Sequence, residues 1–484
     1  MDTTKDPTKK LKILIALHIA LWALIPCLRG SLPLDSIEAI AWGGIGTWGY
    51  DKNPILPGIT ARFFFEIFGE THFGIYLLSQ ICLAGGVIYT YAIAREFLDR
   101  EKSALSAIIL QCVLYYGIST TEFNDNVLSL LLWPMFSYYF IISIKRNSPY
   151  TWLMCGASAG LNALNKYSCI FLFASAFAYA LFTPEGRKIW KYPWMYAGVM
   201  LSIAIFLPHF IWLWNYDFCT LEYLSDRSKE IENIGALRFL YSPLRFIAGL
   251  TINSLPALFA YFICGLRAKY QKSRIALSEL KLIFFLGILP PLLFSLYGMI
   301  NGIKLLSAWG TPMCYFLGII LFAFFPYELS KKRSMMIAVS GYVVFAIITL
   351  AMLFTILFTD SLRYNMNASD YAGKLDAIWR ESVGNDKPLK YVGGTAWWAG
   401  HMSVYSHYKP KFTLLLHKKK NPFFDINDIK KNGILLVNWG PEGKNVENEL
   451  FTNINYETIE IETKNLFGKK RKFKVPYSII PPSD

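Results

Sequence analysis

Long hydrophobic runs are the feature that most constrains the fold of this chain. Up to about residue 358 the sequence repeatedly presents runs of about 17–25 apolar residues, each long enough to cross a bilayer as a helix. Of the 484 residues, 54% are hydrophobic and 17% are charged, whereas soluble proteins carry about a quarter charged residues. Because backbone polar groups must be satisfied inside lipid, such runs fold as helices. The chain is therefore predicted to be a polytopic α-helical membrane protein.

The runs predict about eleven transmembrane helices. The first run follows Lys9, Lys10 and Lys12 and so imitates a signal peptide, but no small-residue cleavage site follows it, and we expect a retained first helix. The approximate limits of the spans are 11–28, 72–94, 103–119, 127–144, 150–164, 167–183, 194–213, 241–265, 281–300, 305–326 and 335–358.

Basic residues concentrate in alternate loops, which is the positive-inside pattern of cytoplasmic loops. The intervening loops hold few basic residues, notably Lys52, Lys166 and Lys304. With an odd number of spans, residues 1–360 form the membrane domain and residues 361–484 lie on the opposite side from the basic loops. The expected location is a bacterial inner membrane, with the C-terminal domain in the periplasm. The basic loops contain Lys9, Lys10, Lys12; Arg95, Arg100, Lys102; Lys145, Arg146; Arg187, Lys188, Lys191; Arg267, Lys269, Lys272, Arg274; and Lys331, Lys332, Arg333.

The net charge of +14 does not indicate nucleic-acid binding, because no basic face interleaved with aromatic residues is present. The eight cysteines show no CxxC spacing, and all precede residue 315. They are expected to be small apolar residues of helices, so neither a disulfide framework nor a cysteine metal site is predicted.

The segment after residue 360 alternates short apolar runs with polar helical patterns and predicts a small α/β domain. Strands are expected at 389–392, 412–416, 434–437 and 458–463, and helices at 372–382 and 426–431. Two histidines of this segment, His401 and His407, lack metal-ligand spacing and are expected on the surface. Its basic residues, among them Lys409, Lys418–Lys420 and Lys469–Lys472, suit an anionic lipid surface or form an ordinary solvated face.

Unusual polar residues collect in the outward set of loops. The first outer loop, 29–71, contains Asp35, Glu38 and Lys52. The other three segments are 121–126, with Glu122 and Asp125, 165–167, with Lys166, and 208–217, with His209 and Asp217. Charged groups at the membrane end of a helix bundle are energetically costly, so their presence indicates a functional role. The convergence of four loops on one face predicts a single site at the outer membrane surface.

The order of these motifs resembles the GT-C glycosyltransferases, in particular the bacterial branch akin to protein O-mannosyltransferases and lipid A aminoarabinose transferases. The motifs that carry the resemblance are Asp35-x-x-Glu38, Gly49-Tyr50-x-Lys52-x-Pro54, Asn165-Lys166-Tyr167, Pro208-His209…Trp214-Asn215-Tyr216-Asp217, Trp309-x-x-Pro312 and Trp397-Trp398-Ala399. The chain departs from that pattern at Asn53, where the family commonly has His, and at Ala308, where it has Asn.

The resemblance implies a sugar donor linked to polyprenyl phosphate, here undecaprenyl phosphate. The acceptor it implies is a lipid, with lipid A or lipopolysaccharide first and a protein hydroxyl second. The runner-up function is a transporter or flippase of lipid-linked sugars. Transporters of that kind often show inverted repeats and midplane charges, and neither is visible in this sequence.

Two tasks follow for a transferase: a base must take the proton of the acceptor hydroxyl, and the departing phosphate must be stabilised. Asp35 is the candidate base, with a helix N-cap as the alternative. Glu38 is catalytic or a capping-box partner. Asp125 is catalytic, a metal ligand or an N-cap. Glu122 is a weaker acidic candidate.

Lys52 and Lys166, with Tyr50, are predicted to hold the donor phosphate. The alternative for Lys52 is a solvated loop lysine. The predicted substrate-binding residues are His209, Trp214, Asn215 and Asp217, for which hydrogen-bonded packing and an interfacial aromatic belt are the alternatives. A divalent metal ion is a further option, with Asp35 and Asp125 as its ligands.

Overall fold

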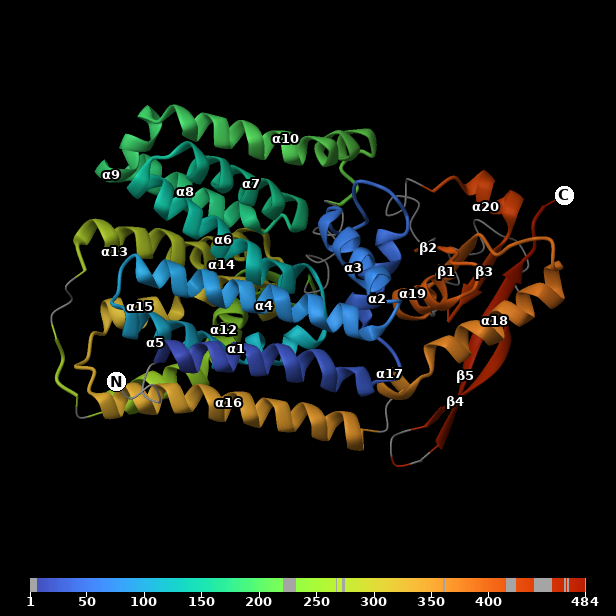
Figure 1. Ribbon diagram of the computed structural model, residues 1–484. Coiled ribbons are helices and arrows are strands. Elements are labelled where there is room, and N and C mark those ends of the chain that lie inside the picture. The colour runs from blue at the N-terminus through green and yellow to red at the C-terminus, as the bar shows by residue number, and fades with distance from the viewer. Residues whose placement is uncertain are drawn as a thin grey trace.

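A bundle of long helices and a smaller mixed domain make up the protein (Figure 1). The computed structural model describes residues 7–220, 232–266, 268–271, 275–359, 362–414, 424–438, 455–464, 467 and 470–483. The bundle helices run roughly side by side, and the mixed domain lies at one end of the bundle. Two shorter helices, α2 (Leu34–Gly43) and α3 (Leu56–Ile67), lie between them.

Eight helices of the described chain are long and apolar enough to cross a membrane, or up to ten if each of two bent pairs is one span. The eight are α1–η2 (Pro7–Leu24, Ile25–Leu28), α4 (His72–Arg95), α6 (Asp125–Arg146), α10 (Pro193–Asn215), η6–α12 (Glu232–Leu237, Arg238–Gly265), α13–η7–α14 (Leu277–Ile283, Phe284–Ile288, Leu289–Asn301), η8–α15 (Ser307–Phe316, Leu317–Phe324) and α16 (Lys331–Phe358). The bent pairs are α5 with η3 and η4 (Arg100–Gln111, Leu114–Tyr116, Ile118–Thr121) and α8 with α9 and η5 (Cys169–Phe182, Pro184–Arg187, Lys188–Lys191), bent by 83° and 90°.

The prediction of a polytopic helical fold is confirmed, with fewer clear spans than the expected eleven or so. The predicted span 150–164 corresponds to α7 (Pro149–Asn165), which has 17 residues. At a rise of about 1.5 Å per residue it is about 25 Å long, which is short against a hydrocarbon core of about 30 Å.

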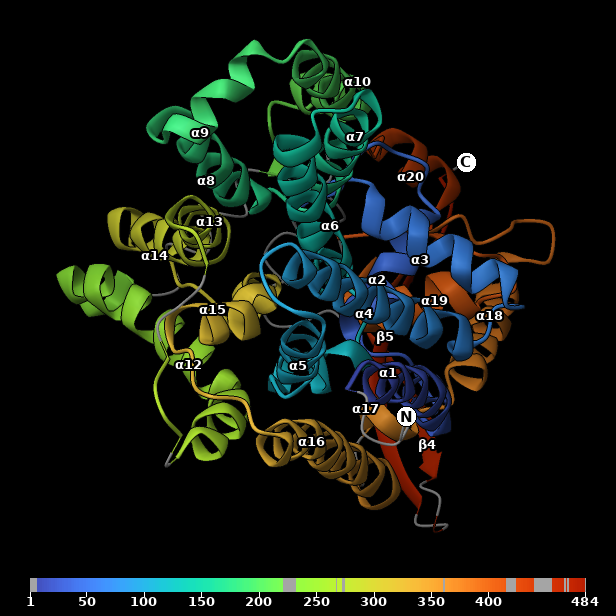
Figure 2. The same ribbon diagram turned by 60° about the vertical axis from the view of Figure 1, so that its left-hand side comes forward.

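Helix α6 packs against α4, α7 and η8 inside the bundle, and Figure 2 shows α4 and α7 on either side of it. In its most apolar stretch 78% of the residues are buried. Glycine allows the neighbouring helices α7 and α10 to touch through their backbones, because a Cβ on Gly156 would lie 2.0 Å from the carbonyl oxygen of Gly198.

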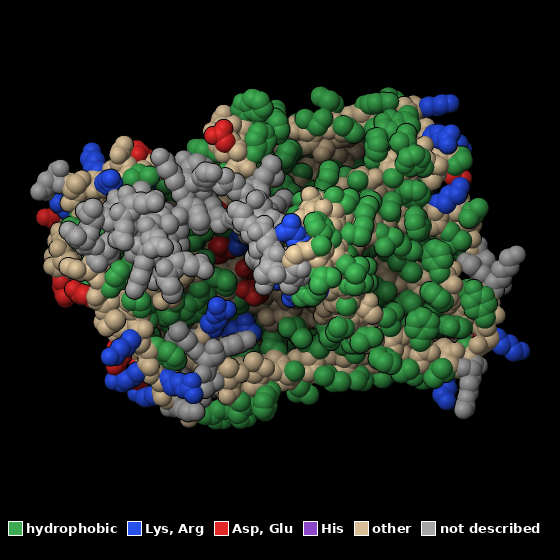
Figure 3. Space-filling view, turned by 180° about the vertical axis from the view of Figure 1, so that it is seen from behind, with side chains coloured by type: hydrophobic (Ala, Val, Ile, Leu, Met, Phe, Trp, Pro, Cys, Tyr) green, Lys and Arg blue, Asp and Glu red, His purple; other side chains and the backbone are tan. Residues whose placement is uncertain are grey.

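The outer surface of the bundle is apolar. Figure 3 shows hydrophobic side chains covering the helical half of one face, with Lys and Arg at the end of the bundle far from the mixed domain and also on the mixed domain itself. Exposed apolar residues occur on α10, α12 and α16, for example Ile203, Leu255 and Ile347. A broad exposed apolar surface of this kind is costly in water and suits contact with lipid tails.

The mixed domain contains a five-stranded sheet with the order β2-β1-β3-β5-β4. Strand β1 pairs in parallel with β2 and β3, and β5 is antiparallel to β3 and β4. The sequence predicted four of these strands. It did not predict β5, whose alternating charges read as a solvated run, or helix α19. The elements are α17 (Leu362–Asn365), α18 (Ala368–Val383), β1 (Tyr391–Gly394), α19 (Ala396–Tyr405), β2 (Lys411–Thr413), α20 (Ile426–Asn432), β3 (Ile434–Val437), β4 (Glu457–Lys464) and β5 (Lys470–Ile480).

The predicted basic patch of this domain is partly visible. On β5, Lys470 and Lys472 pair across the strands with Glu462 and Glu460 at 2.5 and 2.6 Å, as expected of a solvated face. Lys418–Lys420 and Lys469 lie outside the described residues.

The mixed domain and the first outer loop share one hydrophobic core. This core joins Ile37 and Trp42 of α2 to Trp397 and Met402 of α19. The indole nitrogen of Trp397 donates to the carbonyl oxygen of Leu32 at 3.2 Å.

The expectation that His401 is a surface residue was wrong. Its side chain is fully buried in α19 and stacks on Tyr405 with ring centroids 5.9 Å apart. Its Nδ1 bonds the carbonyl oxygen of Trp397 at 2.6 Å, and burial lowers its pKa to about 3. His407 is exposed, as predicted.

Candidate active site

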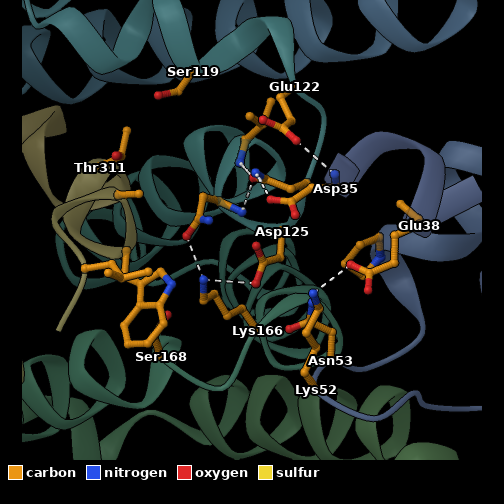
Figure 4. Close-up of a pocket in the computed structure, with 18 of the residues that line it drawn as sticks. Asp35, Glu38, Lys52, Asn53, Ser119, Glu122, Asp125, Lys166, Ser168 and Thr311 are labelled. Atoms are coloured by element: carbon orange, nitrogen blue, oxygen red, sulfur yellow. Dashed lines mark hydrogen bonds and ion pairs between the residues drawn. The ribbon is translucent and has the colours of Figure 1, made fainter. Parts of the chain in front are cut away.

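A pocket of about 760 Å³ opens where the bundle meets the first outer loop and the mixed domain. Four carboxylates and four cationic side chains line it: Asp35, Glu38, Glu122 and Asp125 with Arg29, Lys52, Lys166 and Arg363. Figure 4 shows Asp35 between Glu122 on one side and Asp125 with Lys166 on the other. The structure therefore brings together residues from three of the four outer segments that the sequence singled out.

Asp35 lies in the first turn of α2, where a carboxylate is favoured by the helix dipole. It is not the N-cap of α2, because that position belongs to Pro33, which makes no side-chain cap. One carboxylate oxygen of Asp35, Oδ2, accepts a hydrogen bond from the Asn124 amide at 3.0 Å. The backbone N–H of Asp35 donates to Oε1 of Glu122 at 2.9 Å. Asp35 is thus oriented by neighbours while remaining half-buried on the pocket wall.

Glu38 and Lys52 form a buried ion pair of 2.6 Å. The turn that carries Lys52 is closed by a hydrogen bond of 2.9 Å from the Tyr50 backbone N–H to the Asn53 carbonyl, and the Lys52 ammonium also lies 5.2 Å from the ring centre of Trp42. Burial raises the pKa of Glu38 to about 7, and Lys52 opposes that shift. Burial opposes the charge of Lys52, but the carboxylates of Glu38, Asp51 and Asp35 raise its pKa above the usual value. Lys52 is therefore a fixed positive charge.

The raised pKa of Glu38 predicts a pH-dependent stability. A carboxyl with a raised pKa contributes stability that is fully present below its unfolded pKa of 4.5 and is lost as the pH rises through about 7. We expect the stability of the wild type relative to Glu38→Gln to fall by about 3 kcal/mol across that range. Thermal unfolding in detergent between pH 4.5 and 7.5 measures it.

Glu66→Gln is the matched control, because Glu66 is an exposed carboxylate of the same loop, paired with Arg62. We expect it to change stability by less than about 1 kcal/mol. A pH-independent difference between the wild type and Glu38→Gln would contradict the burial argument.

Lys166 lies between α7 and α8, where the sequence predicted almost no loop. Its ammonium is 2.9 Å from Oδ2 of Asp125 and 2.6 Å from Oδ1 of Asn126. The Asn53 side-chain amide satisfies its neighbours when its nitrogen points toward Asp125, and it then donates to Oδ2 of Asp125 at 3.2 Å. Asp125 is the first residue of α6, and the N-cap is Asn124. The carboxylate of Asp125 therefore neutralises Lys166 instead of capping the helix.

The part of the pocket beside Lys166 is apolar. The Lys166 ammonium lies 5.7 Å from the ring centre of Trp309, and the Phe294 ring contacts the rings of both Trp309 and Phe171. Leu305 and Ile170 line the same region. A cation at the end of an apolar wall suits an amphiphile that has one anionic group on a hydrocarbon chain.

Two arginines of the pocket were not predicted from the sequence. Arg29 follows the first span and Arg363 follows the last one, and both line the pocket. A signal for them existed, because arginines at the outer ends of spans contradict the positive-inside pattern of the other loops. Trp42, Asn53, Asn124 and Asn126 were not predicted as site residues either, although Asn53, Asn124 and Asn126 lie in segments that the sequence singled out.

Some predicted site residues lie behind the pocket wall. Tyr50 is buried and stacks on Trp42 at 4.9 Å, with its hydroxyl against Gly58. His209 is fully buried and bonds the Tyr167 hydroxyl at 2.8 Å and the Trp48 carbonyl at 2.7 Å. Trp42 and Tyr167 line the pocket, so Tyr50 and His209 support lining residues.

Trp214, Asn215 and Asp217 are exposed residues at the end of α10, and the described pocket lining does not include them. Their predicted contact with substrate stays a prediction. So does the metal ion: within the described ranges, no three His, Cys, Asp or Glu side chains are grouped as metal ligands.

Comparison with known proteins bears on the family and the fold of the chain. Residues 52–212 match the family described as dolichyl-phosphate-mannose-protein mannosyltransferase. No curated protein sequence matches the chain. This family model spans 161 of the 484 residues, and it agrees with the predicted resemblance to the protein O-mannosyltransferase branch of the GT-C glycosyltransferases. The predicted fold class and family resemblance are thereby confirmed.

The fold is that of ArnT from Cupriavidus metallidurans. Its crystal structures bound to undecaprenyl phosphate and in the apo state superpose with TM-scores of 0.62 and 0.61. Each covers 98% of this chain and 98% of the ArnT chain, at 11% sequence identity. At that identity the match establishes the fold over nearly the whole of both chains.

Proposed function

We propose that this protein transfers a sugar from undecaprenyl phosphate to a lipid acceptor, with lipid A or another lipopolysaccharide component as the leading candidate. The observation that carries the proposal is the pairing, in one pocket, of an oriented carboxylate, Asp35, with a lysine, Lys166, at the end of an apolar wall. The ArnT structure bound to undecaprenyl phosphate supports the same kind of donor.

The pocket residues support a direct displacement at the sugar. The donor enters with its lipid chain along Phe171, Phe294 and Trp309 and its phosphate beside Lys166. Asp35 accepts the proton of the acceptor hydroxyl as that oxygen bonds to the anomeric carbon. The bond between the anomeric carbon and the phosphate oxygen breaks at the same time, and the charge of the departing lipid phosphate is stabilised by Lys166 and Lys52.

The proposed orientation places the pocket and the mixed domain on the periplasmic face of the inner membrane. The Lys and Arg residues at the opposite end of the bundle support it (Figure 3), because such residues mark the cytoplasmic side. Undecaprenyl-linked sugars used in the periplasm would then meet the pocket at the lipid boundary.

A protein hydroxyl is the second candidate acceptor, since the matched family is described as a protein mannosyltransferase. A transporter of lipid-linked sugars is less well supported, because the charged residues of the pocket gather at one end of the bundle.

Mass spectrometry of lipid A, surface glycans and secreted proteins from cells with and without the gene tests the proposal. We expect a sugar mass to disappear from lipid A without the gene and to return with the wild type but not with Asp35→Asn. Loss of the sugar from proteins instead would identify the second acceptor. Unchanged lipid A, glycans and proteins in cells that lack the gene would overturn the transferase proposal.

A further inference from the structure

The contact between the mixed domain and the bundle creates a second cationic region in the pocket. The Ser31 hydroxyl donates to the carbonyl oxygen of Arg363 at 2.8 Å. There is no room for a side chain at Gly30, since a Cβ would lie 2.6 Å from the Met366 carbonyl oxygen. The segments that carry Arg29 and Arg363 are therefore in direct contact, although in the sequence one follows the first membrane span and the other follows the last.

Glu122 connects the two arginines to the candidate base. Its pKa is raised by burial and by Asp35, while Arg29 and Arg363 act in the opposite direction. Its Oε1 accepts from the backbone N–H of Asp35. Glu122 thus lies beside Asp35 on the side away from Lys166 (Figure 4), and Arg29 and Arg363, which line the same pocket, both act on its carboxylate.

Residues that neighbour Arg29 pack against the mixed domain. Arg29 lies next to His72 and Tyr76 at the start of α4. The His72 ring in turn packs edge-on against Tyr405 of α19, with centroids 6.1 Å apart. The docking of α19 therefore fixes the side of the pocket on which Arg29 lies.

The two cationic regions differ in their surroundings. Lys166 stands at the apolar wall, where a hydrocarbon chain fits, whereas Arg363 is exposed at the domain contact. Paired guanidinium groups bind phosphate and carboxylate oxygens with directed, bidentate hydrogen bonds, which lysine cannot do.

We propose that Arg29 and Arg363 form a second anion-binding site, separate from the donor phosphate site at Lys166, which holds a phosphate or carboxylate group of the acceptor beside Asp35. This inference rests on the proposed function, and it restricts the acceptor to anionic molecules. A neutral hydroxyl compound offers no anionic oxygen to the two guanidinium groups and would be a poor acceptor.

Binding of two amphiphiles to the full chain in detergent tests the site. The probes are hexadecyl phosphate and hexadecanol, which differ only in the anion, and the protein is first saturated with undecaprenyl phosphate. We expect hexadecyl phosphate to bind the saturated protein and hexadecanol not to bind. Arg363→Gln should weaken the binding of hexadecyl phosphate by about tenfold or more and change the affinity for undecaprenyl phosphate by less than about threefold. Arg363→Lys should give an intermediate loss.

Arg62→Gln is the matched control, because Arg62 belongs to the same outer loop and pairs with Glu66 outside the pocket lining. Arg29→Gln is the second variant, and thermal unfolding shows whether it is folded. Complete displacement of hexadecyl phosphate by undecaprenyl phosphate would overturn the proposal. So would an Arg363→Gln variant that loses affinity for both ligands to the same extent. If undecaprenyl phosphate fails to bind the wild type while hexadecyl phosphate binding still requires Arg363, the proposed function fails and the arginine site stands.

Discussion

Asp35→Asn should lower kcat by about 10²–10⁴-fold, the usual contribution of a positioned general base. The asparagine keeps the shape of the side chain and an oxygen that accepts from Asn124, so the hydrogen bond of 3.0 Å can persist. What it loses is the ability to take a proton from the acceptor hydroxyl. Affinity for undecaprenyl phosphate and thermal stability should change little, because Asp35 forms no direct ion pair with a lysine in the part of the chain that the structure describes.

Radiolabelled transfer assays with purified protein, together with binding of undecaprenyl phosphate, separate these effects. Asp99→Asn is the matched control, since Asp99 caps α5 by accepting from the Lys102 backbone N–H at 2.9 Å and Asn caps equally well. We expect its kcat to equal that of the wild type. An Asp35→Asn protein that keeps full kcat would reject Asp35 as the base, and Glu122 would then be the nearest carboxylate to test.

The structure separates the three predicted catalytic acids by their partners. Glu38 is paired with Lys52, and Asp125 is paired with Lys166. Asp35 is held by an amide and a backbone contact. Two of the acids thus serve to place the lysines, and this leaves Asp35 as the carboxylate best suited to receive a proton. Their roles remain predictions until the variants are measured.

The sequence predicted the membrane architecture well because hydrophobic run length and loop charge are local properties. It also placed Asp35, Glu38, Lys52, Asp125 and Lys166 in one site, since loops on one side of a bundle converge. It could not pair Lys166 with Asp125, because they come from different loops, or Lys52 with Glu38, because their contact depends on how the first outer loop folds. His401 illustrates the same limit, as its burial depends on the docking of α19 against α2, which no local pattern encodes.

The arginine pair shows where reading by motif fails. Arg29 and Arg363 are separated by the whole membrane domain in the sequence, and neither belongs to a motif. The contacts of Ser31 with Arg363 and of Gly30 with Met366 bring their segments together at the pocket. A departure from the charge pattern of the loops was the single trace of them in the sequence.

Lys166→Met should weaken binding of undecaprenyl phosphate by about 10–100-fold, the cost of losing a hydrogen bond to a charged group. It should also destabilise the protein, because Asp125 keeps its charge without the ammonium 2.9 Å away. Breaking a fully buried pair costs about 3–5 kcal/mol. These side chains are 14% and 11% exposed, so we expect about 2–3 kcal/mol. Ligand titration and thermal unfolding give the two values.

The double variant Asp125→Asn/Lys166→Met separates the two roles of Lys166. It removes the unpaired carboxylate, so stability should recover, whereas binding of undecaprenyl phosphate should remain weak. Lys102→Met is the matched control, because Lys102 belongs to an exposed pair with Asp99 at 3.1 Å, and such pairs contribute at most about 1 kcal/mol. If the double variant binds undecaprenyl phosphate as tightly as the wild type, Lys166 serves only to neutralise Asp125. The donor phosphate would then have to be held elsewhere in the pocket, with Lys52 as the next residue to substitute.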